Sequence, residues 1–146
     1  MKLLSIIVPV YNEINTLEII IKKLVDLELY NQTKKEIIII DDFSNDGSTE
    51  IIKKYEQRYD YIKAIFKNKN KGKGDSQKLA KKFVNGDYVI IQDADLEYDP
   101  KDINKLLEIA INENKKFVIG HRQMKTSINH PYFYFRELAV NALTLL

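Results

Sequence analysis

Short runs of β-branched and other apolar residues alternate along the chain with longer stretches in which apolar residues recur every three to four positions. The short runs are typical of strands that are covered on both faces. They predict five strands, at residues 4–8, 36–40, 62–66, 87–92 and 117–119. The longer stretches have the spacing of helices that bury one face. They predict helices at residues 15–29, 48–59, 76–84 and 99–114, and an amphipathic helix from about residue 132.

This regular alternation of strands and helices predicts an α/β fold, with a mostly parallel sheet and helices on both faces. The chain has 146 residues, 45% of them hydrophobic, which indicates a single domain with a substantial core. We expect residues 1–122 to form the core and residues 123–146 to form a loop and the amphipathic helix. Because the chain ends inside an apolar-rich stretch, we expect this last region to be truncated.

Composition excludes several classes of protein. The net charge of +2 does not indicate a nucleic-acid partner. The absence of cysteine excludes disulfides and thiolate metal sites. No apolar run reaches the roughly 18 residues of a membrane-spanning helix, so we expect a cytoplasmic protein.

One stretch departs from this balanced charge. Residues 115–136 contain five Lys or Arg and no Asp or Glu, and an apolar segment follows them. This pattern motivates the hypothesis of a peripheral position at the cytosolic face of a membrane. A solvated basic loop is the alternative interpretation.

Polar residues cluster where the predicted strands end. Residues 11–13 follow the first strand, Asp41 and Asp42 follow the second, and Asp93 and Asp95 follow the fourth. Ligands of parallel α/β sheets bind beyond the carboxyl ends of the strands. We therefore expect these residues to meet in one site.

The triplet Asp93-Ala94-Asp95 has the chemistry of a site for a hard cation. Mg²⁺ and Mn²⁺ prefer oxygen ligands and are often shared between one or two carboxylates and a phosphate. Taken alone, an Asp-x-Asp triplet is more typical of an acidic turn than of a metal site. Its place directly after the buried strand at residues 87–92 favours the metal site.

The remaining motifs fit a nucleotide ligand less specifically. Asp41 and Asp42 are suited to accept hydrogen bonds from a base or a ribose, whereas residues 44–48 predict a turn and a helix cap. The ring of Tyr11 offers a stacking face. Residues 70–74 suggest a basic phosphate-binding loop but lack the spacing of a P-loop, and an exposed basic loop is the alternative.

The motifs at residues 5–13, 41–48, 70–74, 93–100 and 120–122 resemble, in order and spacing, those of glycosyltransferase family 2. The resemblance is to the dolichyl-phosphate mannose synthases and the bacterial polyprenyl-phosphate sugar transferases. It implies a GT-A (Rossmann-like) fold, a GDP- or UDP-sugar donor, and Mg²⁺ or Mn²⁺ as cofactor. One departure is Asp75, which adds an acid where relatives usually have a small apolar residue, and the relatives also run on for longer.

Carried over by position, the resemblance assigns roles to individual residues. Those implied to bind the nucleotide-sugar are Pro9, Tyr11, Glu13, Ile40, Asp42, Asp93, Ala94, Asp95 and Arg122. Those implied to bind the metal are Asp93, Asp95 and Glu97. Asp95 and Arg122 are implied to be catalytic, and Arg136 is implied to meet an acceptor phosphate.

These roles predict an inverting sugar transfer to a polyprenyl phosphate. The acceptor oxygen of such a phosphate is already anionic, so no general base is needed. The alternatives are a glycosyltransferase that acts on a glycan hydroxyl and a non-catalytic nucleotide-sugar-binding module. The sequence identifies neither the base nor the sugar, and it does not indicate an oligomeric state.

Overall fold

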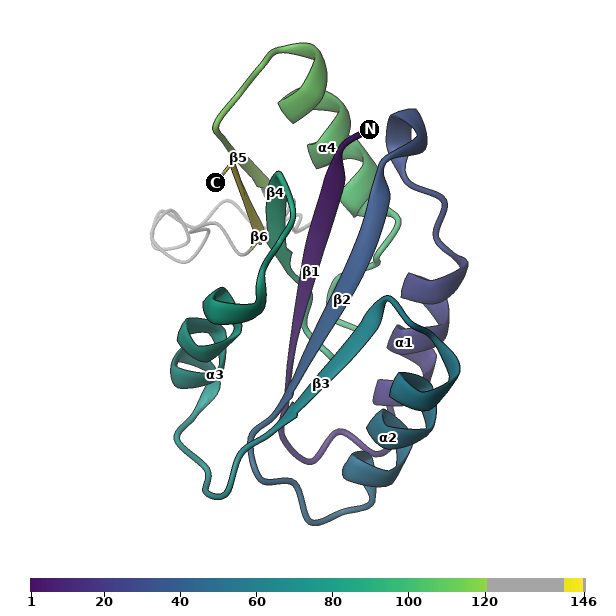
Figure 1. Ribbon diagram of the computed structural model, residues 1–146, viewed down its shortest axis with the longest axis vertical. Helices are drawn as coiled ribbons and strands as arrows, with labels where there is room; N and C mark the ends of the chain where they lie inside the picture. Colours follow the sequence, from purple (N-terminus) through teal and green to yellow (C-terminus); the bar gives the residue numbers. More distant parts are fainter. Residues whose placement is uncertain (121–140, 146) are drawn as a thin grey trace, which may run out of the picture.

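The computed structural model describes residues 1–120 and 141–145 of the chain (Figure 1). The strands are β1 (Leu3–Val10), β2 (Lys34–Asp41), β3 (Ile62–Phe66), β4 (Tyr88–Ile91), β5 (Phe117–Gly120) and β6 (Asn141–Leu145). The α-helices are α1 (Leu17–Asp26), α2 (Ser48–Arg58), α3 (Lys73–Ala80) and α4 (Asp102–Asn112). Two 3₁₀ turns, at Tyr30–Gln32 and Lys81–Phe83, complete the described elements. None of the helices in these two ranges is long and apolar enough to cross a bilayer.

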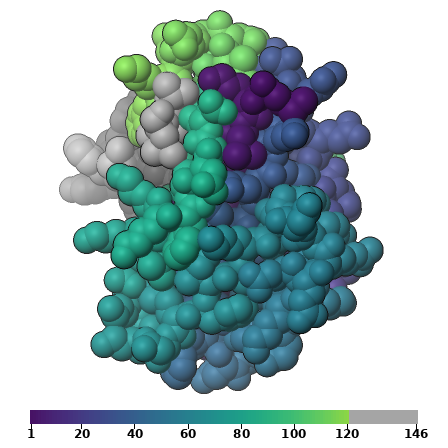
Figure 2. All heavy atoms as spheres, in the orientation of Figure 1, coloured from purple at the N-terminus to yellow at the C-terminus, as the bar shows by residue number. Residues whose placement is uncertain are grey.

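The six strands form one sheet in the order β3-β2-β1-β4-β6-β5. β1 pairs in parallel with β2 and β4, and β2 pairs in parallel with β3, whereas β6 is antiparallel to both of its neighbours. Figure 2 shows the same order at the surface, where the purple start of β1 lies between the segments that contain β2 and β4. The mostly parallel α/β sheet predicted from the sequence is therefore confirmed.

The isoleucines of β2 show why this sheet is covered on both faces. Ile37 and Ile39 pack into the larger core beside α1, α2 and α4, whereas Ile38 and Ile40 belong to a smaller cluster with Ala80 of α3. All four isoleucines are at most 1% exposed. Successive side chains of a strand point to opposite faces, so an unbroken apolar run needs a helix on each side. Three helices cover one face and α3 covers the other (Figure 1).

Pro9 does not end β1 as its sequence position predicts, since the strand continues to Val10. Proline has no N–H, so it is tolerated only where the sheet needs no donor. The carbonyl oxygen of Ile7 accepts a hydrogen bond from the N–H of Gln92 (2.9 Å), so the backbone groups of Ile7 face β4. Pro9 lies two residues further along β1, and its backbone therefore also faces the β4 side. Because the pairing with β4 ends at Ile7, Pro9 removes no hydrogen bond from the sheet.

The chain end differs from the predicted amphipathic helix. Asn141–Leu145 forms β6, which pairs with both β4 and β5. An apolar segment of this length fits either a helix or a strand by pattern, and here the free backbone groups of two neighbouring strands select the strand. The predicted start of the helix near residue 132 lies outside the described residues. The smaller difference at α3 is that it begins at Lys73, three residues earlier than predicted.

A buried polar network fixes the end of the sheet opposite to the polar strand ends. The Ser5 hydroxyl donates to Glu36 Oε1 (2.5 Å) and accepts from the N–H of Gly86 (2.8 Å). Glu36 also accepts from the N–H of Asn85 (2.7 Å). Burial raises the pKa of Glu36, but the hydrogen bonds from Asn85 and Ser5 outweigh it and hold the pKa below its usual range. The network ties the turn at Gly86 to β1 and β2.

Gly86→Ala is expected to destabilise the fold by about 2–3 kcal/mol, because overpacking a rigid site has this typical cost. A Cβ at this position would lie 2.5 Å from Ser5 Oγ, 2.7 Å from Ser5 N and 2.8 Å from the Tyr88 carbonyl oxygen. The free energy of unfolding, measured by chemical denaturation, tests this expectation.

Gly74→Ala is the matched control, since no atom lies within 4 Å of a Cβ built at Gly74. Gly74 lies in the first turn of α3, so alanine is expected to be neutral there or to stabilise by up to about 1 kcal/mol. Equal free energies of unfolding for the two variants would contradict the predicted clash at Gly86.

Candidate functional site

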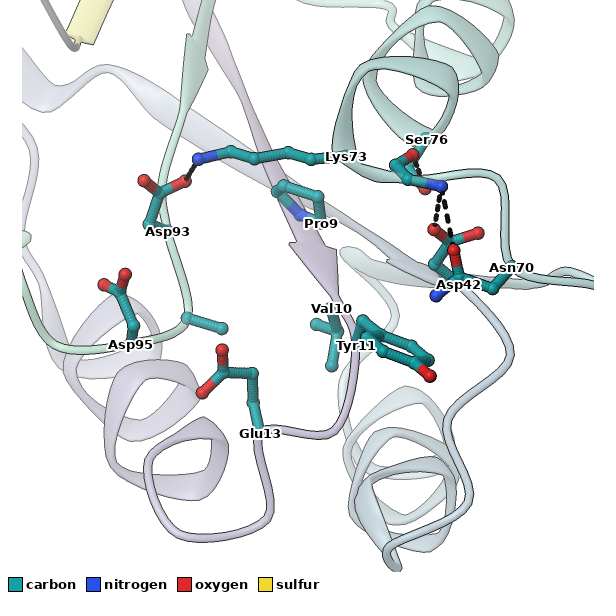
Figure 3. Close-up of a pocket in the computed structure, with 12 residues that line it drawn as sticks. Pro9, Val10, Tyr11, Glu13, Asp42, Asn70, Lys73, Ser76, Asp93 and Asp95 are labelled. Carbon is teal, nitrogen blue, oxygen red and sulfur yellow. Dashed lines mark hydrogen bonds and ion pairs between the residues drawn. The ribbon is translucent and has the colours of Figure 1, made fainter.

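A pocket of about 430 Å³ lies at the carboxyl ends of β1, β2 and β4 (Figure 3). Its volume falls in the range of sites for small molecules, roughly 300–1,000 Å³. It is lined by Pro9, Val10, Tyr11, Glu13, Asp42, Asn70, Gly72, Lys73, Ser76, Asp93, Ala94 and Asp95. Seven of the nine residues implied to bind the donor are among them. The polar strand ends therefore meet in one place, as the topology predicts.

Three of the residues singled out from the sequence lie in the described structure but do not line this pocket: Ile40, Asp41 and Glu97. Ile40 is fully buried in the smaller core cluster and is not exposed to the pocket. Glu97 is not among the lining residues. Arg122 and Arg136 lie outside the described residues.

The loop after β2 holds the loop after β1 in place through side chains. Each of three side chains of the second loop accepts a hydrogen bond from a backbone N–H of the first: Ser44 from Asn12 (3.0 Å), Ser48 from Glu13 (3.0 Å) and Asp46 from Ile14 (2.9 Å). Residues 44–48 thus form the predicted turn and also fix the backbone that carries Tyr11 and Glu13 into the pocket.

Asp41 serves the turn and does not face a ligand. Its two carboxylate oxygens accept from the N–H of Ser44 (2.9 Å) and from the hydroxyl of Thr49 (2.5 Å). Asp41 is 2% exposed and does not line the pocket. Of the two adjacent acids, only Asp42 reaches the site.

Asp42 is held by a buried lysine that was not singled out from the sequence. Lys67 Nζ lies 2.5 Å from Asp42 Oδ1 and 2.7 Å from Asp75 Oδ2, and the Lys67 side chain is 7% exposed. Asp42 also accepts from the N–H of Lys71 (3.0 Å) and of Gly72 (2.6 Å). The unexpected acid at Asp75 is therefore the second partner of a shared cation.

The pKa values of Lys67 and Asp75 are shifted by their contact with each other. Burial lowers the pKa of Lys67, but the hydrogen bonds to Asp42 and Asp75 outweigh it and raise the pKa above its usual range. The hydrogen bond from Lys67 is the main cause that lowers the pKa of Asp75. A sequence signal for Lys67 exists only in retrospect, since two acids beside a predicted anion site require a nearby cation.

Gln92 shapes the loop that carries the acidic triplet. Its side chain is buried, and its Nε2 donates to the carbonyl oxygens of Asp93 (3.1 Å) and Tyr98 (3.0 Å), which closes the loop. Asp95 Oδ1 accepts from the N–H of Glu97 (2.9 Å), and Leu96 between them has a φ of 64°. This tight turn explains why Glu97 does not join Asp93 and Asp95 in the pocket lining.

Each of the three strand-end loops holds one non-glycine residue in the left-handed region. These residues are Asn12 (φ 55°), Phe43 (φ 69°) and Leu96 (φ 64°). Such conformations typically cost about 1–3 kcal/mol each and persist only where surrounding contacts enforce them. The hydrogen bonds of Ser44, Asp41 and Gln92 supply those contacts here.

The pocket carries an excess of negative charge. Four carboxylates line it, those of Glu13, Asp42, Asp93 and Asp95, against the single ammonium of Lys73. Lys73 Nζ lies 2.6 Å from Asp93 Oδ1 (Figure 3). Asp95 is exposed and makes no ion pair within residues 1–120. An anionic ligand therefore needs an additional cation in order to bind here.

The donor set fits a divalent cation shared with a ligand. No three His, Cys, Asp or Glu side chains converge on a metal position in the part of the chain that the structure describes. The three-carboxylate site predicted with Glu97 is thus not formed. Asp93 and Asp95 remain, and Mg²⁺ is commonly bound by one or two carboxylates together with the phosphates of a substrate.

The family model described as "Glycosyl transferase family 2" matches residues 5–141. The chain belongs to this family. The match contains all of the strand-end loops that build the pocket.

Three curated relatives illustrate the similarity. The undecaprenyl-phosphate 4-deoxy-4-formamido-L-arabinose transferase of Photorhabdus laumondii is 34% identical over 123 residues, which are 84% of this chain and 37% of that protein. The cholesterol galactosyltransferase of Borreliella burgdorferi is 34% identical over 142 residues (97% and 36%). The dolichol-phosphate mannosyltransferase of Pyrococcus furiosus is 32% identical over 134 residues (92% and 37%). The chain thus spans little more than a third of the length of these relatives.

Solved glycosyltransferases share the fold. A mannosyltransferase of Pyrobaculum calidifontis, solved with GDP-Man and Mn²⁺, superposes with a TM-score of 0.71 at 20% identity, over 82% of this chain and 35% of that one. S. aureus TarS (residues 1–349) with UDP-GlcNAc superposes with a TM-score of 0.70 at 25% identity, over 94% and 39%. The fold is GT-A, as the family resemblance implied.

Asp75→Asn is expected to lower stability at neutral pH and to lose this effect in acid. Lys67 holds the folded-state pKa of Asp75 below its usual value of about 3.9. The contribution of the Asp75 charge is therefore complete above that value and is lost as the pH falls through the lowered pKa. The free energies of unfolding of wild type and variant, measured from pH 7 down to the onset of acid unfolding, are expected to draw closer as the pH falls below about 3.9.

Asp60→Asn is the control for this pH profile, because Asp60 makes the same charge change without an ion pair among the described residues. Its difference from wild type is expected to be small and nearly constant with pH. A difference for Asp75→Asn that stays the same from pH 7 down to the onset of acid unfolding would show that the Lys67 contact does not act through charge.

Proposed function

We propose that this chain is the donor-binding part of an inverting glycosyltransferase that transfers a sugar from a nucleotide-diphosphate sugar to a polyprenyl phosphate. The observation that carries the proposal is the acidic pocket, in which carboxylates from three strand ends face one another across a cavity large enough for a small molecule. A ligand that brings both a divalent cation and phosphates satisfies this arrangement. Membership of glycosyl transferase family 2 supports a donor of that kind.

The two sides of the pocket suit the two ends of such a donor. Tyr11 and Asp42 lie on one side, and Asp93 and Asp95 lie on the other (Figure 3). Tyr11 is 49% exposed and free to stack on a base, and Asp42 is fixed by Lys67 as a rigid acceptor for base or ribose hydrogens. We assign the nucleoside to this side, together with Pro9 and Glu13, and the diphosphate to Asp93, Ala94 and Asp95.

Asp93 and Asp95 are the residues that would hold Mg²⁺ or Mn²⁺. When bound, the cation supplies positive charge that stabilises the departing nucleoside diphosphate. Of these two acids, Asp95 has no cationic partner in the described part of the chain, whereas Asp93 pairs with Lys73, so we assign Asp95 the larger share of the ligation. Arg122 remains a proposed second positive charge on the diphosphate, and Arg136 remains a proposed contact of the acceptor phosphate.

The names of two relatives support a polyprenyl-phosphate acceptor, since they are an undecaprenyl-phosphate sugar transferase and a dolichol-phosphate mannosyltransferase. A phosphate acceptor is anionic near neutral pH and needs no general base. A peripheral contact with a membrane is part of this proposal, because such acceptors reside in lipid. The relative named cholesterol galactosyltransferase favours a hydroxyl acceptor as the second candidate.

Asp95→Ala is expected to lower sugar transfer at least about 100-fold, because the diphosphate loses the charge that stabilises its departure. The measurement uses radiolabelled UDP- and GDP-sugars with Mn²⁺, and it compares undecaprenyl phosphate with an oligosaccharide acceptor. Glu108→Gln, on the exposed side of α4, is the control of equal charge change and is expected to retain wild-type transfer.

Each alternative function has its own outcome in this assay. Binding of the donor without any turnover would identify a nucleotide-sugar-binding module. Transfer to the oligosaccharide with none to undecaprenyl phosphate would refute the lipid-phosphate acceptor and leave the donor assignment intact.

A further inference from the structure

We infer that Lys73 is a further donor-binding residue that exchanges partners: it neutralises Asp93 in the free pocket and passes to the diphosphate when a divalent cation takes Asp93. The inference rests on the proposed function, because it names a residue that recognises the same donor. It assigns a role to the basic loop at residues 70–74, whose predicted alternative was a merely exposed loop.

Lys73 lies at the start of α3 and reaches across the pocket. Gly72, with a φ of 85°, turns the chain into α3, and Lys73 is the first residue of that helix. From there its side chain extends past Pro9 to Asp93 on the far side of the pocket (Figure 3). Lys73 is the one cationic side chain among the residues that line this pocket.

The ion pair between Lys73 and Asp93 is weak enough to be broken by a metal. The Lys73 side chain is 53% exposed, whereas the Asp93 side chain is 11% exposed. Ion pairs with an exposed partner are typically worth less than about 1 kcal/mol, since water and salt compete with them. A divalent cation that is shared between Asp93 and Asp95 interacts with two carboxylates at once. Such a cation therefore displaces the ammonium from Asp93 at little cost.

Once it leaves Asp93, the Lys73 ammonium has a new anionic partner in the diphosphate. A diphosphate whose cation is held by Asp93 would lie close to that carboxylate, which the Lys73 ammonium already reaches at 2.6 Å. Lysine is a common phosphate ligand because its ammonium is a compact charge with three donors. Lys73 therefore keeps an anionic partner in both states, and its charge is never left unpaired.

Lys67 is the contrasting case of a lysine that keeps its carboxylate partners permanently. It is 7% exposed and sits between two carboxylates, at 2.5 Å from Asp42 and 2.7 Å from Asp75. Burial and two simultaneous partners prevent it from turning towards a ligand. Lys73 has one carboxylate partner in the described structure, a long exposed stem and a place in the pocket lining, which are the properties that exchange requires.

The exchange predicts effects of opposite sign for Lys73→Met. Binding of Mn²⁺ alone is expected to become about three- to fivefold tighter, because the metal no longer competes with the ammonium. Binding of UDP or GDP at saturating Mn²⁺ is expected to become about tenfold weaker, because the diphosphate loses a charge-assisted hydrogen bond. Mn²⁺ binding is measured from the electron paramagnetic resonance signal of free Mn²⁺, and nucleotide binding by titration calorimetry.

Two further variants control this experiment. Lys78→Met removes the same charge from an exposed position of the same helix that does not line the pocket, and it is expected to leave both affinities unchanged. Lys73→Arg keeps a cation on a long stem and is expected to restore nucleotide binding to within about threefold of wild type.

The outcomes separate the exchange from its alternatives. If Lys73→Met weakens both Mn²⁺ and nucleotide binding, Lys73 is a structural tie between α3 and the acidic loop, and the exchange is refuted. If it matches Lys78→Met, Lys73 has no role in the site. If wild type binds neither Mn²⁺ nor nucleotide, the proposed function itself fails together with this inference.

Discussion

Repulsion among carboxylates is the constraint on which the functional end of this molecule depends. Parallel strands deliver their carboxyl ends to one edge of the sheet, and in this chain three of those ends carry acids. Like charges this close raise the free energy of the folded state unless cations intervene. The loops around the pocket supply two of those cations, Lys67 and Lys73, and the residual negative charge suits the proposed ligand, a diphosphate that brings a divalent cation.

Two lysines meet this constraint in different ways. Lys67 is buried between Asp42 and Asp75 and forms part of the permanent structure. Lys73 covers Asp93 from an exposed position and leaves Asp95 uncompensated within the described residues. The Asp42 side of the pocket is thereby held rigidly, whereas the side with Asp93 and Asp95 has an exposed lysine and a carboxylate without an ion pair among the described residues. The short loop between β3 and α3 separates Lys67 from Lys73. Asp42 fixes this loop, because its carboxylate accepts hydrogen bonds from the backbone N–H groups of Lys71 and Gly72.

Local pattern and topology made part of this structure predictable from the sequence. The four isoleucines of β2 indicated a strand covered on both faces, and the acids after three strands indicated one shared site, because the carboxyl ends of parallel strands meet. Features that depend on contacts between distant residues were not predictable. Lys67 reveals its role only when β3 lies beside β2, and β6 forms a strand only because β4 and β5 offer it backbone partners. The places of Ile40, which is buried in the core, and of Glu97, which is not among the residues that line the pocket, also depend on the packing of the whole sheet and were not predictable from the local pattern.

The left-handed residues Asn12, Phe43 and Leu96 have a consequence for the thermodynamics of recognition. Hydrogen bonds that form without any ligand offset the backbone strain at these residues. The cost of holding the loops in this conformation is therefore part of the free energy of folding and not of the free energy of binding. When a ligand binds, the loops within residues 1–100 lose little conformational entropy, because they are already ordered. Less of the free energy of the ligand's contacts is then spent on ordering the loops, and more of it appears as affinity. Replacing these residues by glycine would relieve the strain but return conformational freedom to the unbound loops. The rim of the pocket is thus shaped during folding, before any ligand binds.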